Sequence, residues 1–216
     1  MVKILLPYIE RHYQFEKALW SLKKYTPKEV EIILIDDKER KGMSVVFNKY
    51  FTGEDDLILW HADMYATEGW YEKLMKYKDT FDIIGMKLVY PNNVIQHYGG
   101  GIKENGVCFH PHQHCLDYGL DKPQECVFVT WGGVLVKKEV IQKVGKIDEQ
   151  FFQTYYGDVD YCLKARELGF KVGVVPVKLI HEESLDTRQN PKIKEIMENN
   201  WNIFQAKWMN LLAGAL

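Results

Sequence analysis

Residues 55–63, DDLILWHAD, combine an unbroken apolar run with an acidic residue at the end of the run. Residues 30–37, VEIILIDD, repeat the pattern and end in two acids. Strands as continuously apolar as these are typical of parallel sheets, because helices cover both faces of such sheets. The two stretches therefore predict an α/β fold in which acidic side chains follow buried strands.

The pattern continues outward from these stretches, because apolar strands alternate with amphipathic helices over residues 1–90 and order returns after a loop-rich segment at 91–125. Such alternation predicts one domain with a mostly parallel central sheet and helices on both faces. We expect strands at residues 2–7, 30–37, 55–63, 81–90, 126–136 and 171–181. We expect helices at residues 12–25, 43–51, 66–80, 137–145, 158–169 and about 191–212, with Phe15, Leu19 and Leu22 facing the core and Thr67 as an N-cap.

The composition excludes several classes of protein. The 216 residues carry a net charge of −2, which gives no electrostatic reason to expect nucleic acid as a partner. No apolar run is long enough for a transmembrane segment or a signal peptide. The four cysteines form no CxxC pair, as expected of a reduced chain. These features predict a cytoplasmic protein.

Acidic residues stand where parallel α/β sheets bind ligands, beyond the carboxyl ends of the strands. Asp36, Asp37 and Asp63 all occupy such ends. A carboxylate like that of Asp63 can hold Mg²⁺ or Mn²⁺ against a pyrophosphate, although an aspartate there can also be a helix cap or turn residue. His61 should lie on the same side of the strand as Asp63, either beside the ligand or as a polar residue at the sheet edge. The chain has neither a G-x-G-x-x-G fingerprint nor a Walker loop, so nucleotide binding would depend on these acids.

Two further stretches leave alternatives open. Trp131, Gly132 and Gly133 form either a loop that lets the backbone approach a ligand or a tight bend in a strand. The segment HPHQH contains His110, His112 and His114, but it lacks the fixed spacing of a zinc site, and we favour a loop beside a substrate.

Five blocks of this sequence, in order, carry a family resemblance: VEIILIDD (30–37), LILWHADMYATEGWYEKL (57–74), IIGMKLVYPNNVIQHYGGGI (83–102), VTWGGVLVKKEVIQKVGKIDEQFF (129–152) and YYGDVDYCLKARELGFKVGVVPVKLIHEES (155–184). With this order and spacing, the chain resembles the family-two glycosyltransferases of the GT-A fold, especially the rhamnosyltransferase-like branch. The resemblance covers nearly the whole length.

The resemblance implies a donor site in the first part of the chain, about residues 1–65. Pro7 and Tyr8 would meet the nucleotide, although the family's usual P-T-Y-N-R is PYIER here. Asp36 or Asp37 would accept a hydrogen bond from the ring N–H of uracil or thymine. Trp131, Gly132 and Gly133 would lie beside the donor sugar or its phosphates.

The resemblance also implies a metal site and a catalytic base. Asp63 matches the last residue of the family's D-x-D motif, His61 replaces the first acid, and His181 matches a histidine that closes over Mn²⁺ or Mg²⁺. In the second part, about residues 66–216, Asp158 matches the general base that deprotonates the acceptor hydroxyl, with Gly157 where the family has glutamate. Asp160 is the second candidate, and it can instead cap the helix or orient Arg166.

The function implied by this resemblance is metal-dependent transfer of a sugar from a UDP- or dTDP-sugar to a hydroxyl of a glycan, glycoprotein or glycolipid. The family inverts the anomeric carbon, and a retaining outcome remains open. One rival is a non-catalytic module that binds sugar nucleotides or glycans. A nucleotidyltransferase is a second rival, but it would need a glycine-rich basic loop where PYIERHYQF stands. The chain is compact for the family, which leaves open that it is part of a longer, multidomain protein.

Overall fold

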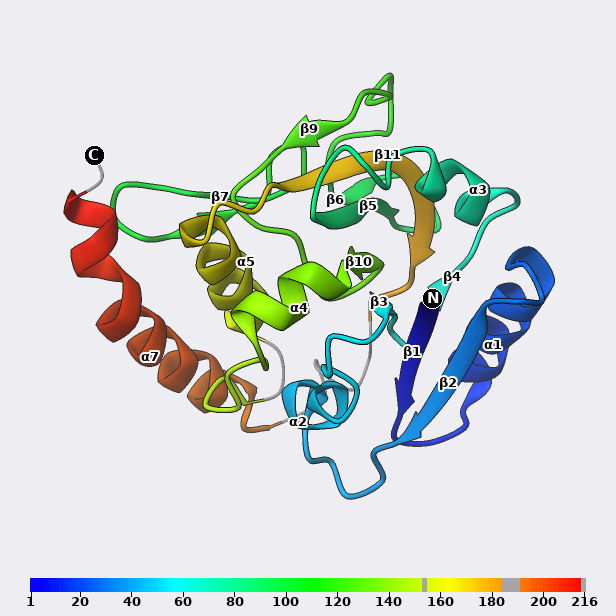
Figure 1. Cartoon of the computed structure of the whole chain (residues 1–216), viewed down its shortest axis with the longest axis horizontal. Helices are drawn as coiled ribbons and strands as arrows, with labels where there is room; N and C mark the ends of the chain where they lie inside the picture. Colours follow the sequence, from blue (N-terminus) through cyan, green and yellow to red (C-terminus); the bar gives the residue numbers. More distant parts are fainter. Residues whose placement is uncertain (153–154, 184–190, 215–216) are drawn as a thin grey trace.

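The apolar runs of the sequence form the centre of a nine-stranded sheet in the computed structural model, which describes residues 1–152, 155–183 and 191–214 (Figure 1). The strands follow the order β2-β1-β3-β10-β5-β11-β4, with β6 beside β5 and β9 beside β11, and a separate ribbon pairs β7 with β8. The strands are β1 (Val2–Tyr8), β2 (Glu31–Asp36), β3 (Asp56–Leu59), β4 (Met64–Tyr65), β5 (Ile83–Val89), β6 (Ile95–His97), β7 (Gly101–Ile102), β8 (Cys108–Phe109), β9 (Gln124–Glu125), β10 (Val134–Val136) and β11 (Val172–His181). The helices are α1 (Tyr13–Tyr25), α2 (Met43–Asn48), α3 (Trp70–Met75), α4 (Lys138–Val144), α5 (Gly157–Glu167) and α7 (Ile193–Gly214).

The strand directions confirm the predicted, mostly parallel sheet. β1 runs parallel to both β2 and β3, and β5 runs parallel to β11. β10 is antiparallel to β3 on one side and to β5 on the other, so β3 and β5 share one direction. The carboxyl ends of β2, β1, β3, β5 and β11 therefore lie along one edge of the sheet. β10 begins at that same edge.

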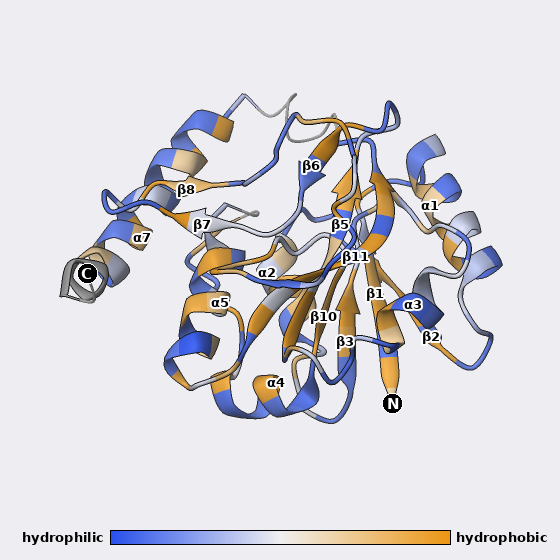
Figure 2. Ribbon diagram, turned by 90° about the horizontal axis from the view of Figure 1, so that it is seen from above, coloured by the Kyte–Doolittle hydropathy of each residue, from blue (hydrophilic) through white to orange (hydrophobic). Residues whose placement is uncertain are grey.

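Side-chain alternation along the strands divides the core into two layers. Leu5, Leu59 and Val134 pack toward α2, α4, α5 and α7, while their neighbours Ile4, Ile58 and Leu135 pack toward α1 and α3. Each strand is thus apolar on both faces, and Figure 2 shows the sheet as the most hydrophobic layer of the molecule. The three residues expected to face the core from α1 are buried: Phe15, Leu19 and Leu22.

Two local predictions are wrong for identifiable reasons. The strand expected over 126–136 is ordered as β10 only from Val134, because the chain turns at Gly133 with a φ of 64°. Thr67 does not cap α3: its hydroxyl donates to the carbonyl of Lys178 at 2.7 Å, and Gly69 occupies the N-cap position.

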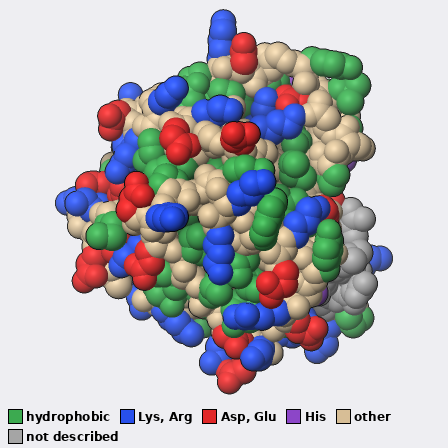
Figure 3. Space-filling model, turned by 90° about the vertical axis from the view of Figure 1, so that its right-hand side faces the viewer, with side chains coloured by type: hydrophobic (Ala, Val, Ile, Leu, Met, Phe, Trp, Pro, Cys, Tyr) green, Lys and Arg blue, Asp and Glu red, His purple; other side chains and the backbone are tan. Residues whose placement is uncertain are grey.

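The exposed surface carries both signs of charge. On the face shown in Figure 3, Lys and Arg side chains alternate with Asp and Glu rather than gathering into a patch of one sign. Within the described part of the chain, no helix is both long enough and apolar enough to cross a membrane.

Candidate functional site

A cavity of about 740 Å³ opens at the edge where the parallel strands end. Its lining includes Tyr8 at the end of β1, Asp37 after β2, and His181 at the end of β11. Trp131 also lines the cavity, although it precedes a strand instead of following one. The strand that it precedes, β10, is antiparallel to β3 and therefore begins at this edge of the sheet. The sheet topology thus collects, from distant parts of the sequence, most of the residues that the sequence pointed to: Pro7, Tyr8, Asp37, His61, Asp63, Trp131, Asp158 and His181.

Three of these residues form a compact cluster of metal-ligand type. The ligand atoms of His61, Asp63 and His181 all lie within 4.8 Å of one another. Nε2 of His181 is 3.1 Å from Oδ1 of Asp63, and the rings of His61 and His181 lie 5.5 Å apart. His61 and Asp63 come from the turn between β3 and β4, and β11 pairs with β4 through His181 and Met64. The pairing of two strands that meet at the sheet edge therefore closes the cluster.

Unpartnered atoms within the cluster fit a bound cation. Oδ2 of Asp63 and Nε2 of His61 are buried, and neither has a hydrogen-bond partner in the described residues. Leaving such atoms unpaired costs about 1–3 kcal/mol each, a cost that a cation would remove. Two imidazoles and a carboxylate suit Mn²⁺ and related divalent metals, and three protein ligands leave coordination positions open.

The protonation of the cluster also favours metal binding. Burial and the neighbouring His181 lower the pKa of His61 to about 4, so its imidazole is neutral at pH 7. Burial alone would raise the pKa of Asp63, but the hydrogen bond and charge of His181 outweigh it and hold that pKa below its usual value. Nδ1 of His181 is hydrogen-bonded to Oε1 of Gln96, which orients the ring so that Nε2 faces Asp63.

Asp158 lies in the cavity wall at the start of α5. The chain turns sharply just before Asp158, because Tyr156 has a φ of 68° and α5 begins at Gly157. Oδ1 of Asp158 accepts a hydrogen bond from the N–H of Val159 at 2.9 Å. Burial raises the pKa of Asp158 to about 7, although backbone N–H groups, including that of Trp131, act in the opposite direction. A carboxyl group with this pKa can take up a proton near neutral pH.

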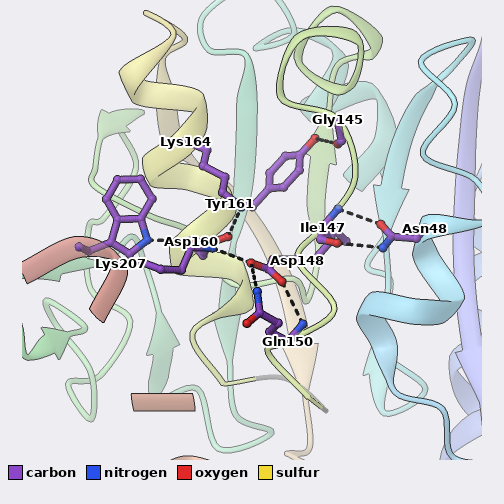
Figure 4. A network of polar contacts seen from close by, with 10 residues as sticks. Asn48, Gly145, Ile147, Asp148, Gln150, Asp160, Tyr161, Lys164 and Lys207 are labelled. Carbon is purple, nitrogen blue, oxygen red and sulfur yellow. Dashed lines mark hydrogen bonds and ion pairs between the residues drawn. The ribbon is translucent and has the colours of Figure 1, made fainter. Parts of the chain in front are cut away.

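Asp160 lies outside the cavity lining, although only one residue separates it from Asp158. Its carboxylate is fully buried between α5 and α7, where it accepts from Nε1 of Trp208 at 3.0 Å and pairs with Lys164 and Lys207 at 2.8 Å (Figure 4). Neither predicted alternative applies: α5 has no side-chain cap, and Arg166 bonds Glu125 and the carbonyl of Cys126. Asp160 ties two helices together.

Three other residues that were predicted to belong to the site do not line the cavity. Asp36 is exposed, pairs with Lys38 and is absent from the lining. A Cβ on Gly132 would approach the His61 ring to 3.1 Å, and one on Gly133 would lie 2.7 Å from Leu179. Gly132 therefore lets the loop at Trp131 pack closely against His61, and Gly133 lets the chain turn against Leu179. Neither glycine lines the cavity itself.

Asp37 both lines the cavity and organises the loop that follows β2. Its two carboxylate oxygens accept from the backbone N–H groups of Lys41 and Gly42 at 2.7 and 3.2 Å. Several lining residues escaped the sequence analysis because they come from the short strand β6, from the loop before β10 and from the last helix. They are Gln96, His97, Thr130, Ile193 and Met197.

Known structures share this arrangement of sheet and helices. The crystal structure of GalNAc-T7 with UDP, GalNAc and Mn²⁺ superposes with a TM-score of 0.65 at 14% identity, over 83% of this chain and 43% of that one. The chain has the GT-A fold. TarS of S. aureus, in a structure of residues 1–349, matches with a TM-score of 0.55 at 11% identity, over 97% of this chain and 73% of that one.

Similarity in sequence to curated proteins is more distant. The uncharacterized protein y4gI of Sinorhizobium fredii is 32% identical over 108 residues, which is 47% of this chain. The O-antigen biosynthesis protein RfbC of Myxococcus xanthus is 26% identical over 143 residues, which is 61% of this chain. This GT-A chain matches only 12% and 11% of the lengths of these two relatives. No family model matches the chain.

Proposed function

We propose that the chain is a metal-dependent glycosyltransferase that transfers a sugar from a UDP- or dTDP-linked donor to a hydroxyl group. The acceptor would be a glycan, glycoprotein or glycolipid. One observation carries the proposal: the same cavity holds a metal-ligand cluster with unpartnered buried atoms and, in another wall, a carboxyl group whose pKa is raised to about 7. The GT-A fold and the distant similarity to an O-antigen biosynthesis protein agree with it.

The donor would occupy the part of the cavity formed by the first three strand ends. His61, Asp63 and His181 would hold Mn²⁺ or Mg²⁺, and such an ion stabilises the negative charge of a departing diphosphate. Pro7, Tyr8 and Asp37 would line the nucleotide pocket. UDP in the GalNAc-T7 structure supports a pyrimidine nucleotide as the donor group.

Asp158 would be the general base. It would take the proton from the acceptor hydroxyl while that oxygen attacks the anomeric carbon of the donor sugar. The bond between this carbon and the diphosphate oxygen breaks, and the nucleoside diphosphate leaves. Attack from the side opposite the leaving group inverts the anomeric carbon. A base on the acceptor side is what such a direct displacement requires.

The first test is a calorimetric titration of UDP, and then dTDP, with and without Mn²⁺. We expect binding to the wild-type chain to depend on the metal and to be lost in Asp63→Ala, which removes the only carboxylate of the cluster. Asp121→Ala, at an exposed aspartate outside the cavity, is the matched control and should bind as the wild type does.

Failure of both nucleotides to bind the wild-type chain would refute the transferase proposal. Metal-dependent binding without turnover of any UDP-sugar would instead favour the rival proposal, a non-catalytic module that binds sugar nucleotides. His61 and Gly157, which stand where the family has acidic residues, are the features that keep this rival open. Release of UDP from UDP-sugars, measured with and without acceptors, separates the two.

A further inference from the structure

His97 and His110 form a pair in the cavity wall that the proposed reaction does not use. Their Nδ1 atoms lie 2.8 Å apart, and their rings meet edge to face at 5.0 Å. His97 ends β6, and His110 directly follows β8. Both line the cavity, whereas His112 and His114 of the same HPHQH segment do not. The structure thus selects one histidine of the motif and pairs it with a buried partner.

The hydrogen bond within the pair excludes a double positive charge, and burial favours the fully uncharged form. A hydrogen bond between two Nδ1 atoms needs a proton on one ring and a lone pair on the other, so both rings cannot be imidazolium. Burial lowers the pKa of both histidines, and His97 is only 2% exposed. The ring that donates from Nδ1 has a bare Nε2, and the ring that accepts carries a proton on Nε2. The pair therefore offers one donor and one acceptor.

Three buried polar atoms of the cavity lining lack partners. Nε2 of His97, Oγ1 of Thr130 and Nε1 of Trp131 are buried without a hydrogen-bond partner among the residues that the structure describes. All three residues line the cavity. The ring of Phe128 packs beside both histidines, with ring centres 6.3 and 5.5 Å away. An apolar ring face beside a few unpaired donors and acceptors suits a ligand with hydroxyl groups on an apolar ring skeleton.

The pair also lies near the proposed base. Phe128 packs against the pair, and the backbone of Trp131, three residues further on, donates to Asp158. Three residues of chain span at most about 11 Å. Cys108 lies two residues before His110 and close to Asp158. Burial is the main reason why the pKa of the Cys108 thiol is raised, and the negative charge of Asp158 raises it further. The histidine pair and Asp158 thus line one cavity and are joined by short stretches of chain.

We propose that His97 and His110 form the subsite that holds the acceptor as an uncharged sugar ring, by hydrogen bonds to hydroxyl groups other than the attacking one. The inference rests on the proposed function, because Asp158 marks the attacking hydroxyl. The neutral pair offers no charge to a uronic acid or an amino sugar. The class of acceptor is therefore a neutral glycoside.

The test is ligand-observed NMR in the presence of UDP and Mg²⁺, with methyl glycosides of glucose, galactose, mannose and rhamnose as probes. We expect at least one glycoside to bind the wild-type chain and to bind about tenfold more weakly to His97→Phe and to His110→Phe, as loss of a buried hydrogen bond predicts. The phenylalanine keeps a ring in the wall but removes its polar atoms. UDP affinity should stay within about twofold of wild type, which also verifies that the variants fold.

His114→Asn is the matched control, because His114 belongs to the same loop, is exposed and lies outside the cavity lining. It should bind glycosides as the wild type does. Unchanged glycoside binding in both phenylalanine variants would overturn the inference, as would a wild-type chain that binds UDP but none of the four glycosides. A wild-type chain that does not bind UDP would overturn the proposed function instead. If, in that case, the wild-type chain bound a glycoside and the two phenylalanine variants did not, the subsite would still be supported, but the protein would be a glycan-binding protein and not a transferase.

Discussion

The carboxyl group of Asp158 gives the proposed reaction a defined pH dependence. Burial raises its pKa to about 7, and only the deprotonated form can accept a proton from the acceptor. The rate of transfer should therefore rise with pH and level off above about pH 7, since a carboxyl group with a raised pKa gains its active form as pH increases. Asp158→Asn should lower the rate about a hundredfold or more and abolish this pH dependence. Steady-state rates at pH values on both sides of 7 measure both effects.

UDP binding is the control for this variant, because Asp158 is assigned to the acceptor and not to the donor. Calorimetry should give Asp158→Asn the UDP affinity of the wild type. A wild-type rate that does not change across neutral pH would count against the assignment. Full activity of the asparagine variant would exclude Asp158 as the base, since an amide cannot take up the proton.

Helix α7 holds the segment that leads to the proposed base. Asn200 of α7 is fully buried, and its Nδ2 donates to the carbonyls of Phe152 and Tyr155 at 2.9 and 3.0 Å. These carbonyls belong to the segment that leads into α5 and Asp158. Asn200→Ala would leave them without this donor, so we expect the free energy of unfolding to fall by about 1–3 kcal/mol and the transfer rate to fall with it. Urea unfolding and steady-state kinetics measure the two quantities.

Asn199→Ala provides the comparison, because Asn199 is exposed on the same helix and makes the same change in helix propensity. The free energy of unfolding of Asn199→Ala should match that of the wild type within about 0.5 kcal/mol, and its transfer rate should equal the wild-type rate. Equal behaviour of the two variants would mean that α7 does not hold the segment before Asp158 in place.

The regular elements could be predicted from the sequence because their signals are local. The helix expected at 12–25 is α1 at Tyr13–Tyr25, and the strand expected at 171–181 is β11 at Val172–His181. The strand expected at 126–136 fails for a non-local reason. The chain turns at Gly133, where Leu179 and Met64, both distant in sequence, leave no room for a Cβ. The residues next to Gly133 in sequence give no indication of these contacts.

The residues of the candidate site likewise fall into those that the local sequence predicts and those that it does not. Residues at strand ends could be predicted, because parallel strands bring their carboxyl ends together. Asp160 could have been separated from Asp158 by helix geometry alone: at 3.6 residues per turn, two residues apart in sequence point to nearly opposite faces. One aspartate therefore reaches the cavity and the other meets Trp208. The pairing of His97 with His110 depends on how β6 and the short β7–β8 ribbon fold back, and nothing in the local sequence encodes it.

The cavity joins residues from nearly the whole chain, from Pro7 to Met197, so a ligand that fills it should stabilise the entire fold. A ligand that binds only the folded state at a hundred times its Kd adds about 2.7 kcal/mol to the free energy of unfolding. For a chain of this size, that is a rise of about 5–10 °C in Tm. UDP and Mn²⁺ should act together if, as proposed, the ion held by the metal-ligand cluster would also contact the diphosphate. We expect the rise in Tm with both ligands to exceed the sum of the rises with each alone.

Differential scanning calorimetry of the wild-type chain and Asp63→Ala, at fixed ligand concentrations, tests this coupling. By linkage, an ion that raises the affinity for UDP has its own affinity raised by UDP by the same factor. In Asp63→Ala the ion has lost its carboxylate, so the two ligands should no longer exceed the sum of their separate effects. Purely additive shifts in the wild-type chain would mean that cation and nucleotide occupy separate sites. The cluster of His61, Asp63 and His181 would then be a metal site without a part in donor binding.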